Sequence, residues 1–174
     1  TGGRMYGLLR FREEVLEPTR QELGLLAVGI TETFNAQHEL GLDLNGAAGG
    51  SFFTAVAPTV AEASTNRGAA TATATISDAS ALQPADYRLQ WTGATWELTN
   101  TSTGDTQNAA DGAFNVDGLA IAVGGGVPEL GDSFLVRPYF RAASAMDVAL
   151  SRASDVAASA PLVSSESVSN KGSA

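Results

Sequence analysis

The chain has 174 residues, a formal net charge of −9 and only ten basic residues. This length allows one domain, or one domain with an appendage, and a real hydrophobic core. No run of Lys or Arg is present to neutralise phosphates, which argues against nucleic-acid binding and against attraction to anionic membranes. The chain contains no cysteine, which excludes disulfides and thiolate metal sites. No apolar run reaches the roughly 18 to 20 residues that span a membrane.

Residues 8–40 are predicted to form one long amphipathic helix, about 50 Å long at 1.5 Å per residue. Pro18 interrupts the pattern and is expected either to kink the helix or to begin a second one. Gly41 is a plausible C-terminal stop. Because no second apolar stripe of similar strength follows, we expect the stripe to pack on helices outside this chain. The predicted assembly residues, spaced by three, four or their sums, are Phe11, Val15, Leu23, Leu26, Ile30 and Phe34.

After residue 51 the pattern changes to short strands separated by turns. Tyr87, Leu89 and Trp91 alternate with polar residues, and Gly93-Ala94 is a two-residue hairpin candidate. That hairpin would bring Trp91 and Trp96 close enough for a cross-strand pair. We therefore predict a small antiparallel sandwich or barrel-like module. The predicted strands are residues 52–60, 69–76, 86–92, 95–100, 119–123 and 133–136.

These elements indicate an α+β fold, in which a long N-terminal amphipathic stalk carries an antiparallel β-rich sandwich. Residues 1–50 are interpreted as the helical stalk segment and its loop, and residues 51–141 as the β-rich outer domain. Residues 142–174 are interpreted as a weak helix over 142–158 followed by a flexible tail, because this part is rich in Ala and Ser. The N-terminus does not resemble a signal peptide, and without an initiator Met we expect a fragment or a processed product.

No catalytic or metal-binding motif is complete. His38 is the only histidine, so a Ser-His-Asp triad would have to use it, and no Gly-x-Ser-x-Gly elbow is present. We expect His38 to have a structural role near the helix end. The stretch from Asp43 to Gly46 is interpreted as a turn, because the residues that follow lack the oxygen side chains of a calcium loop.

The aromatic residues of the β region allow two interpretations. Tyr87, Trp91 and Trp96 would form a sugar-stacking platform if they were exposed, or the core of the sandwich if they were buried. We favour the core, because aromatic residues make up only 7% of the chain. An extracellular carbohydrate-binding or adhesion module is the alternative function.

Four segments carry a resemblance to a known family. In order along the chain they are residues 7–18, residues 34–38 with Gly41, Asp43, Gly46, Phe52 and Phe53, residues 86–89 with 96–99, and residues 132–138 leading into Ala142 and Ala143. Together they are similar to the middle of proteins of the flagellar hook-associated protein 1 family. The segment from 41 to 53 argues against the filament protein and the second junction protein.

The resemblance implies a structural component of the bacterial flagellum, with no enzymatic activity, cofactor or metal. It implies export through the flagellar secretion channel without a cleaved signal peptide, and an export chaperone for the full-length protein. The expected place is extracellular, in a ring of identical subunits at the hook–filament junction, between the hook protein and the second junction protein. Family members also have N- and C-terminal helical segments, which we expect this chain to lack. Without them we expect the isolated fragment to be a monomer.

Overall fold

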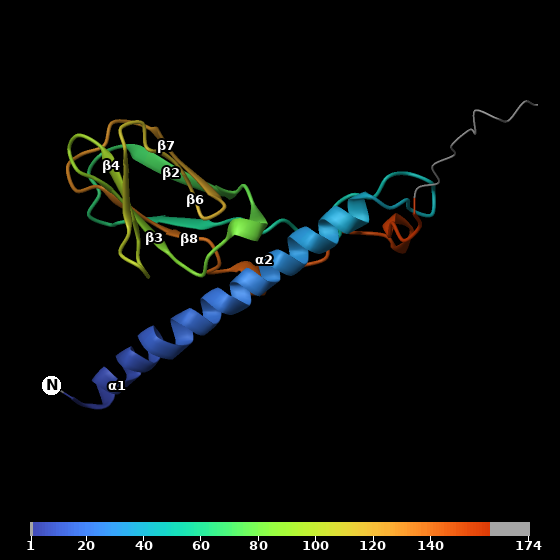
Figure 1. Cartoon of the computed structure of the whole chain (residues 1–174), viewed down its shortest axis with the longest axis horizontal. Helices are drawn as coiled ribbons and strands as arrows, with labels where there is room; N and C mark the ends of the chain where they lie inside the picture. The colour runs from blue at the N-terminus through green and yellow to red at the C-terminus, as the bar shows by residue number, and fades with distance from the viewer. Residues whose placement is uncertain (1, 161–174) are drawn as a thin grey trace, which may run out of the picture.

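The computed structural model describes residues 2–160 and begins with one continuous helix of 36 residues. It consists of α1 (Arg4–Phe11), a π-helical turn (Arg12–Leu16) and α2 (Glu17–Glu39). At 1.5 Å per residue this rod is about 54 Å long. Its N-terminal third extends away from the rest of the molecule, and the β module lies beside the middle of α2 (Figure 1). The predicted long helix is confirmed.

Pro18 neither ends the helix nor begins a new one. A proline inside a helix lacks an N–H and crowds the carbonyl four residues earlier, here that of Glu14. The π-helical turn immediately before it loosens this spacing, because the N–H of Glu17 donates to the carbonyl of Arg12, five residues back. We attribute the wider turn to Pro18, and the helix axis continues through it (Figure 1).

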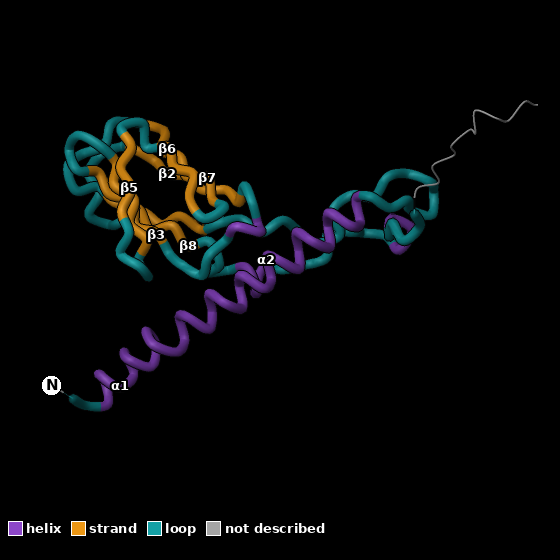
Figure 2. Tube along the Cα trace, viewed as in Figure 1, coloured by secondary structure: helices purple, strands orange, loops and turns teal. Residues whose placement is uncertain are grey.

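The strands form two antiparallel sheets that pack face to face (Figure 2). One sheet has five strands in the order β1-β8-β3-β4-β5, and the other has three in the order β2-β7-β6. The predicted α+β fold with an antiparallel sandwich is confirmed. The strands are β1 (Thr59–Glu62), β2 (Ala70–Ile76), β3 (Tyr87–Trp91), β4 (Trp96–Asn100), β5 (Thr106–Ala109), β6 (Ala113–Val116), β7 (Leu119–Gly125) and β8 (Ser133–Arg137).

The hairpin between β3 and β4 forms as predicted. Gly93 has a φ of 97°, and Thr92 N–H donates to the Thr95 carbonyl over 3.0 Å, which closes a two-residue loop. Trp91 and Trp96 are paired across the strands with ring centroids 5.3 Å apart. The register therefore places both indoles on the same face of the sheet.

Other strand predictions were wrong in extent. The strand predicted over 52–60 reduces to β1, because Phe52 and Phe53 leave the sheet and pack against Phe34 of α2. Strands β5 and β6 were not predicted. Strand β5 is polar and largely exposed, so it shows no apolar alternation, and its hydrogen bonds to β4 define it.

The helix predicted over 142–158 is also wrong in extent. Only α3 (Ala142–Ala145) and a 3₁₀ turn (Ala153–Asp155) are helical. Residues 146–160, here called the return segment, run alongside the C-terminal part of α2 and the loop after it (Figure 2). Its backbone also pairs with that loop: Ala149 N–H donates to the Phe52 carbonyl over 2.8 Å. The predicted tail at 164–174 lies outside the described residues.

The hydrophobic core is continuous from the sandwich to the rod. Tyr87, Leu89 and Phe134 fill the space between the sheets, and Val28 of α2 belongs to the same buried cluster. Tyr139, which follows β8, is 1% exposed and lies between the two parts. The rod is therefore attached to the module by packed side chains as well as by the chain itself.

Candidate functional site

Helix α2 has two faces of opposite character. The face that packs on the rest of the chain consists of small or polar residues, with Val28 the largest aliphatic among them. These residues follow helical spacing and are Gly24, Ala27, Val28, Thr31, Asn35 and His38. The larger apolar side chains of the predicted stripe lie on other sides of the helix and are exposed. The chain thus uses its less hydrophobic face for internal packing.

Close approach explains the small residues on the inner face. A Cβ atom added at Gly24 would lie 2.5 Å from the Cβ of Tyr139, a distance that real side chains do not adopt. Helix α2 therefore touches the backbone after β8 directly at this point. Glycine lowers helix propensity by about 1 kcal/mol relative to alanine, so its presence here reflects packing and not local helix formation.

An ionic brace fixes the rod to the sandwich beside this contact. Arg137 at the end of β8 donates to Glu17 of α2 over 2.8 Å and to Asp86 over 3.1 Å. Its guanidinium also lies 3.9 Å from the centre of the Phe140 ring, which Arg20 approaches to 4.1 Å. Burial raises the pKa of Asp86, and the charge of Arg137 partly offsets this effect.

At the C-terminal end of α2, His38 joins three parts of the chain. Its Nε2 accepts the backbone N–H of Ala157 over 2.8 Å, so Nδ1 carries the ring hydrogen and donates to the Gly50 carbonyl at 2.6 Å. The side chain is 5% exposed. This is the structural role expected for His38, and it leaves neither ring nitrogen free for a metal or a substrate.

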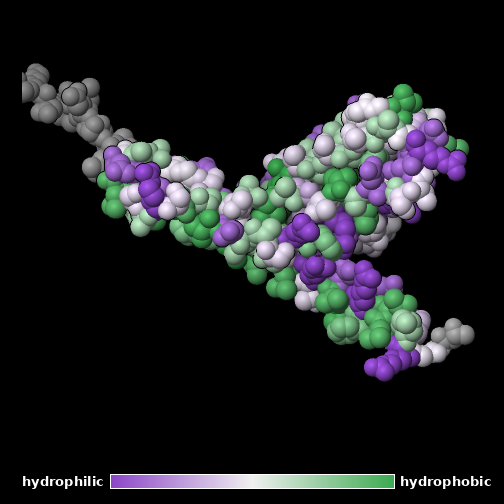
Figure 3. Space-filling model, turned by 180° about the vertical axis from the view of Figure 1, so that it is seen from behind, coloured by the Kyte–Doolittle hydropathy of each residue, from purple (hydrophilic) through white to green (hydrophobic). Residues whose placement is uncertain are grey.

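All six predicted assembly residues are on the molecular surface. Their exposed fractions run from 44% for Ile30 to 60% for Leu26. Within residues 2–160 no segment covers them fully, although Phe52 and Phe53 pack against Phe34. Apolar side chains gather along the rod in the space-filling view (Figure 3). We call these six residues the rod stripe: Phe11, Val15, Leu23, Leu26, Ile30 and Phe34.

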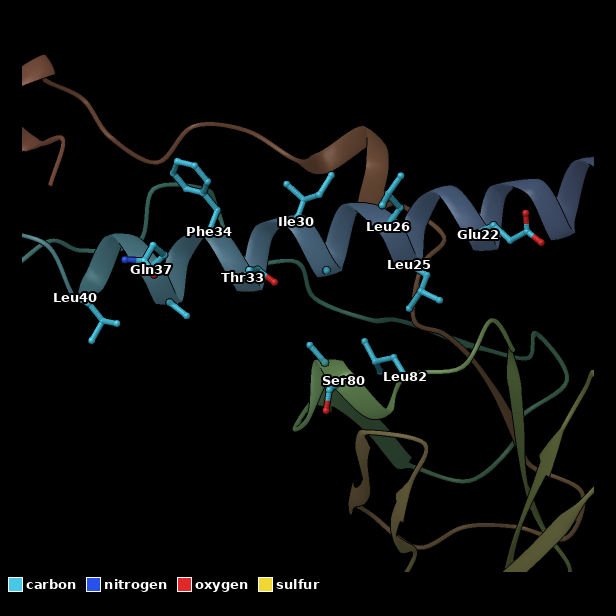
Figure 4. Close-up of a pocket in the computed structure, with 13 residues that line it drawn as sticks. Glu22, Leu25, Leu26, Ile30, Thr33, Phe34, Gln37, Leu40, Ser80 and Leu82 are labelled. Carbon is cyan, nitrogen blue, oxygen red and sulfur yellow. The ribbon is translucent and has the colours of Figure 1, made fainter. Parts of the chain in front are cut away.

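The structure divides the rod stripe among three places. Leu26, Ile30 and Phe34 project from the same side of α2 and line a groove of about 1310 Å³ (Figure 4). Leu23 lies in a second hollow of about 400 Å³ with Tyr139. The remaining two residues lie nearer the N-terminus, where the rod has left the module.

The sequence pattern missed most residues of the groove, among them the apolar pair Leu25 and Leu82. Leu25 points toward Leu82, which follows the 3₁₀ turn Ala79–Ala81, and together they form the wall on the module side (Figure 4). Leu25 is adjacent to Leu26 and therefore lies on a different side of the helix, so a stripe defined by steps of three and four residues omits it. Leu82 comes from a turn far away in sequence, and no periodic signal relates it to the helix.

Alternative chemistries find little support in the geometry. Trp96 is 3% exposed and Tyr87 1% exposed, so these side chains do not form an open sugar-stacking platform. The Asp43 carboxylate accepts the N–H groups of Asn45 and Ala47, as in a turn. Among the described residues, no three side chains of metal-binding type come together. None of the helices in residues 2–160 is long and apolar enough to cross a membrane.

Comparison with known proteins gives matches to one family along most of the chain. The family model "Flagellar hook-associated protein FlgK helical domain" matches residues 1–53, and "Flagellar hook-associated protein 1, D2-like domain" matches residues 60–138. Flagellar hook-associated protein 1 of Salmonella typhimurium is 36% identical over 159 residues, which are 89% of this chain and 29% of that protein. The Escherichia coli K12 protein is 35% identical over 158 residues, with the same coverage.

A solved structure agrees with these sequence matches. The flagellar hook junction protein FlgK from Burkholderia pseudomallei superimposes with a TM-score of 0.81 at 36% identity, over 92% of this chain and 30% of that one. The chain thus spans about three tenths of the length of the relatives that it matches. Both halves of the fold, the rod and the sandwich, fall within matched regions. The chain belongs to the flagellar hook-associated protein 1 family.

Proposed function

We propose that this chain forms the rod and outer module of a non-enzymatic structural subunit at the junction between the flagellar hook and filament. The observation that carries the proposal is the exposed rod stripe, which lies beside a face of the helix that is already packed. Relatives of 35% and 36% identity bear the name flagellar hook-associated protein 1, which supports the same role. The subunit would act as a mechanical adaptor, in a ring with copies of itself, between the hook protein and the second junction protein.

The rod stripe is suited to helix packing. Burying one Leu, Ile or Phe side chain contributes roughly 1.5 to 3 kcal/mol, so a row of such residues would stabilise an assembly substantially. Exposed apolar patches of this extent on a soluble protein mark interaction sites. The groove beside Ile30 is long and open, as a neighbouring helix would require (Figure 4). The stripe would therefore pack against helices of the same full-length subunit or of adjacent ones.

The N-terminal part of the rod, α1, would be covered by other helices on more sides than α2. In α1 no residue is buried, and Met5, Tyr6, Leu8, Leu9 and Phe11 are between 49% and 72% exposed. These residues lie on several sides of the helix, and a helix that is apolar on several sides is normally enclosed. We propose that α1 is surrounded in a bundle, whereas α2 is covered on its outer side only.

The family assignment supports further proposals about the full-length protein. It would be exported through the flagellar secretion channel without a cleaved signal peptide, with the help of a chaperone, and would reside outside the cell. It would need no cofactor. The isolated chain would be a monomer, because the helices that cover its stripe belong to the remainder of the protein or to other subunits.

Immunogold electron microscopy of flagellated cells, with antibody raised to this chain, tests the location. One spot per flagellum, where hook meets filament, is expected. Label along the whole filament, or over the cell body with bare junctions, would contradict the proposal and favour a filament or adhesin role.

The part played by the rod stripe is tested in the full-length protein. Leu26→Asp and Ile30→Asp should abolish junction assembly and filament growth while the protein is still exported. Leu26→Met is the matched control, because it keeps an apolar side chain of similar volume at the same position. Normal flagella in both aspartate variants would show that this face is not an assembly surface.

A further inference from the structure

The loop after the rod contains a pair of residues with a characteristic reactivity. Asn45 is followed by Gly46, and it is the only one of the seven asparagines in the chain that precedes a glycine. Both residues are exposed, and nothing lies within 4 Å of the position that a Cβ of Gly46 would occupy. A glycine at this position places no side chain between its own backbone nitrogen and the preceding asparagine side chain, so ring closure between the two is unhindered.

We propose that Asn45 is a site of spontaneous deamidation and that Asp43 controls its rate. In this reaction the Gly46 amide nitrogen loses its proton to solvent base and attacks Cγ of Asn45. The new N–Cγ bond closes a five-membered imide as the Cγ–Nδ2 bond breaks, and the leaving NH₂ group takes a proton from solvent and departs as ammonia. Water then opens the imide at either carbonyl, giving aspartate or isoaspartate. No oxidant or enzyme is needed, because the net change is the exchange of ammonia for water.

Asp43 forms hydrogen bonds with both reacting residues, and these bonds restrain them. Its Oδ1 accepts the backbone N–H of Asn45 and of Ala47, each over 2.8 Å, and its Oδ2 accepts the side-chain Nδ2 of Asn45 over 3.2 Å. Its carbonyl accepts the N–H of Gly46, the attacking nitrogen, over 3.1 Å. The bond from Ala47 lowers the pKa of the Asp43 carboxyl, so the group stays ionised and accepting at neutral pH.

The loop must therefore open before the imide can form. Its bonds are local and solvent-exposed, and such bonds open far more readily than those of a core. Deamidation of the folded protein should accordingly be slower than in an unstructured peptide but still faster at Asn45 than at any other asparagine. Asn35, for comparison, is buried on α2, with its side chain bonded to Phe53.

The modification would also weaken the hydrogen bonds that hold the return segment against the loop after the rod. Leu44 N–H donates to the Ser154 carbonyl over 3.2 Å, and Leu42 pairs with Ser159 in a β-bridge. An isoaspartate at position 45 adds a methylene to the backbone between these contacts and the bond from Ala47. Either product adds a negative charge beside Asp43. We expect faster amide exchange at Leu44 in the modified protein.

The experiment incubates the full chain at 37 °C in mildly alkaline buffer and follows each asparagine by peptide mapping and mass spectrometry. The signal is the mass change for replacing NH₂ by OH, with the isoaspartyl peptide resolved by chromatography. A synthetic peptide of residues 41–48 provides the unstructured rate. Asn45→Gln is the control that removes the reactive pair, and circular dichroism verifies that each variant is folded.

Asn45 should convert first, several-fold more slowly than in the peptide, and Asp43→Ala should move its rate toward that of the peptide. An unmodified Asn45 after the peptide has converted fully, or earlier conversion of another asparagine, would overturn the site. An unchanged rate in Asp43→Ala would overturn the role of Asp43. Asp43→Asn separates the effects: it keeps an acceptor for the N–H groups and removes the charge, so an intermediate rate is expected.

Discussion

Asn35 and Phe53 are joined by two hydrogen bonds that tie the rod to the chain leading into the sandwich. Asn35 Nδ2 donates to the Phe53 carbonyl over 2.9 Å, and the Phe53 N–H donates to Asn35 Oδ1 over 2.8 Å. The side-chain amide of Asn35 thereby satisfies both backbone groups of Phe53, as a residue on a neighbouring strand would do. The Phe53 ring packs against Phe34 on the same helix at 5.4 Å. This pairing fixes the start of the chain that leads into the sandwich against α2.

Replacing Asn35 by Ala should lower the free energy of unfolding by about 2 kcal/mol, because it leaves the half-buried N–H and carbonyl of Phe53 without partners. Asn35→Asp is the matched control, since its ionised carboxylate keeps the acceptor for the Phe53 N–H and loses only the donor. Its loss of stability should be smaller at acidic pH, where the protonated carboxyl can again donate to the Phe53 carbonyl. Chemical denaturation measures both. An Asn35→Ala protein as stable as the original would show that water satisfies the Phe53 backbone without cost.

The two faces of α2 predict opposite responses to truncation in the isolated chain. Val28→Ala should cost about 2 kcal/mol, because the side chain is fully buried in the shared core. Leu26→Ala should change stability by no more than about 0.5 kcal/mol, because its side chain is 60% exposed. The same exposure implies that Leu26→Asp leaves the helix content of the isolated chain largely intact.

The continuous core further predicts a single unfolding transition. Fluorescence of Trp91 and Trp96 reports on the sandwich, and far-ultraviolet circular dichroism reports on the rod. The two signals should change together during denaturation, because Val28 and Tyr139 belong to one buried cluster. Loss of helical signal before any change in fluorescence would mean that the rod and the sandwich unfold as separate units.

Asp132 predicts a specific dependence of stability on pH. Its carboxylate accepts the backbone N–H groups of Glu129, Arg67 and Gly68, at 2.8, 2.8 and 3.0 Å, and these bonds lower its pKa. A carboxyl whose pKa is lower in the folded state contributes stability above its unfolded pKa, and loses it as pH falls through the folded value. The stability difference between the protein and Asp132→Asn should therefore shrink with acidification. A difference that is constant from neutral to acidic pH would contradict this assignment.

His38 predicts where the return segment is held. His38→Ala removes the acceptor of the Ala157 N–H and the donor to Gly50, and should cost about 1 to 3 kcal/mol. Hydrogen exchange should accelerate at Ala157 while the strands of the sandwich stay protected. His38→Gln is an informative companion, because the glutamine amide retains both an acceptor and a donor in a different arrangement. Equal exchange rates at Ala157 in the original protein and in both variants would show that His38 does not hold the return segment in place.

Much of the fold could be predicted from the sequence because short-range residue patterns define the rod and the β3–β4 hairpin. Apolar spacing identified the rod, and alternation together with Gly93 identified the β3–β4 hairpin and its tryptophan pair. Strand β5 and the return segment lacked such signals. The first is a polar strand paired with β4, and the second is held by bonds to the loop after the rod, so neither carries a hydrophobic period of its own.

The sequence alone determined that a long helix carries a stripe of large apolar residues, and that the chain offers no complete catalytic motif. Only the tertiary structure decided which face of that helix packs internally. It selected Gly24 and its small or polar neighbours, since close approach to Tyr139 and the hydrogen bonds that Asn35 donates and His38 accepts stabilise this face without large apolar side chains. Such complementarity depends on residues up to 119 positions away, from His38 to Ala157. The apolar face is left exposed for that reason, and there the proposed assembly surface lies.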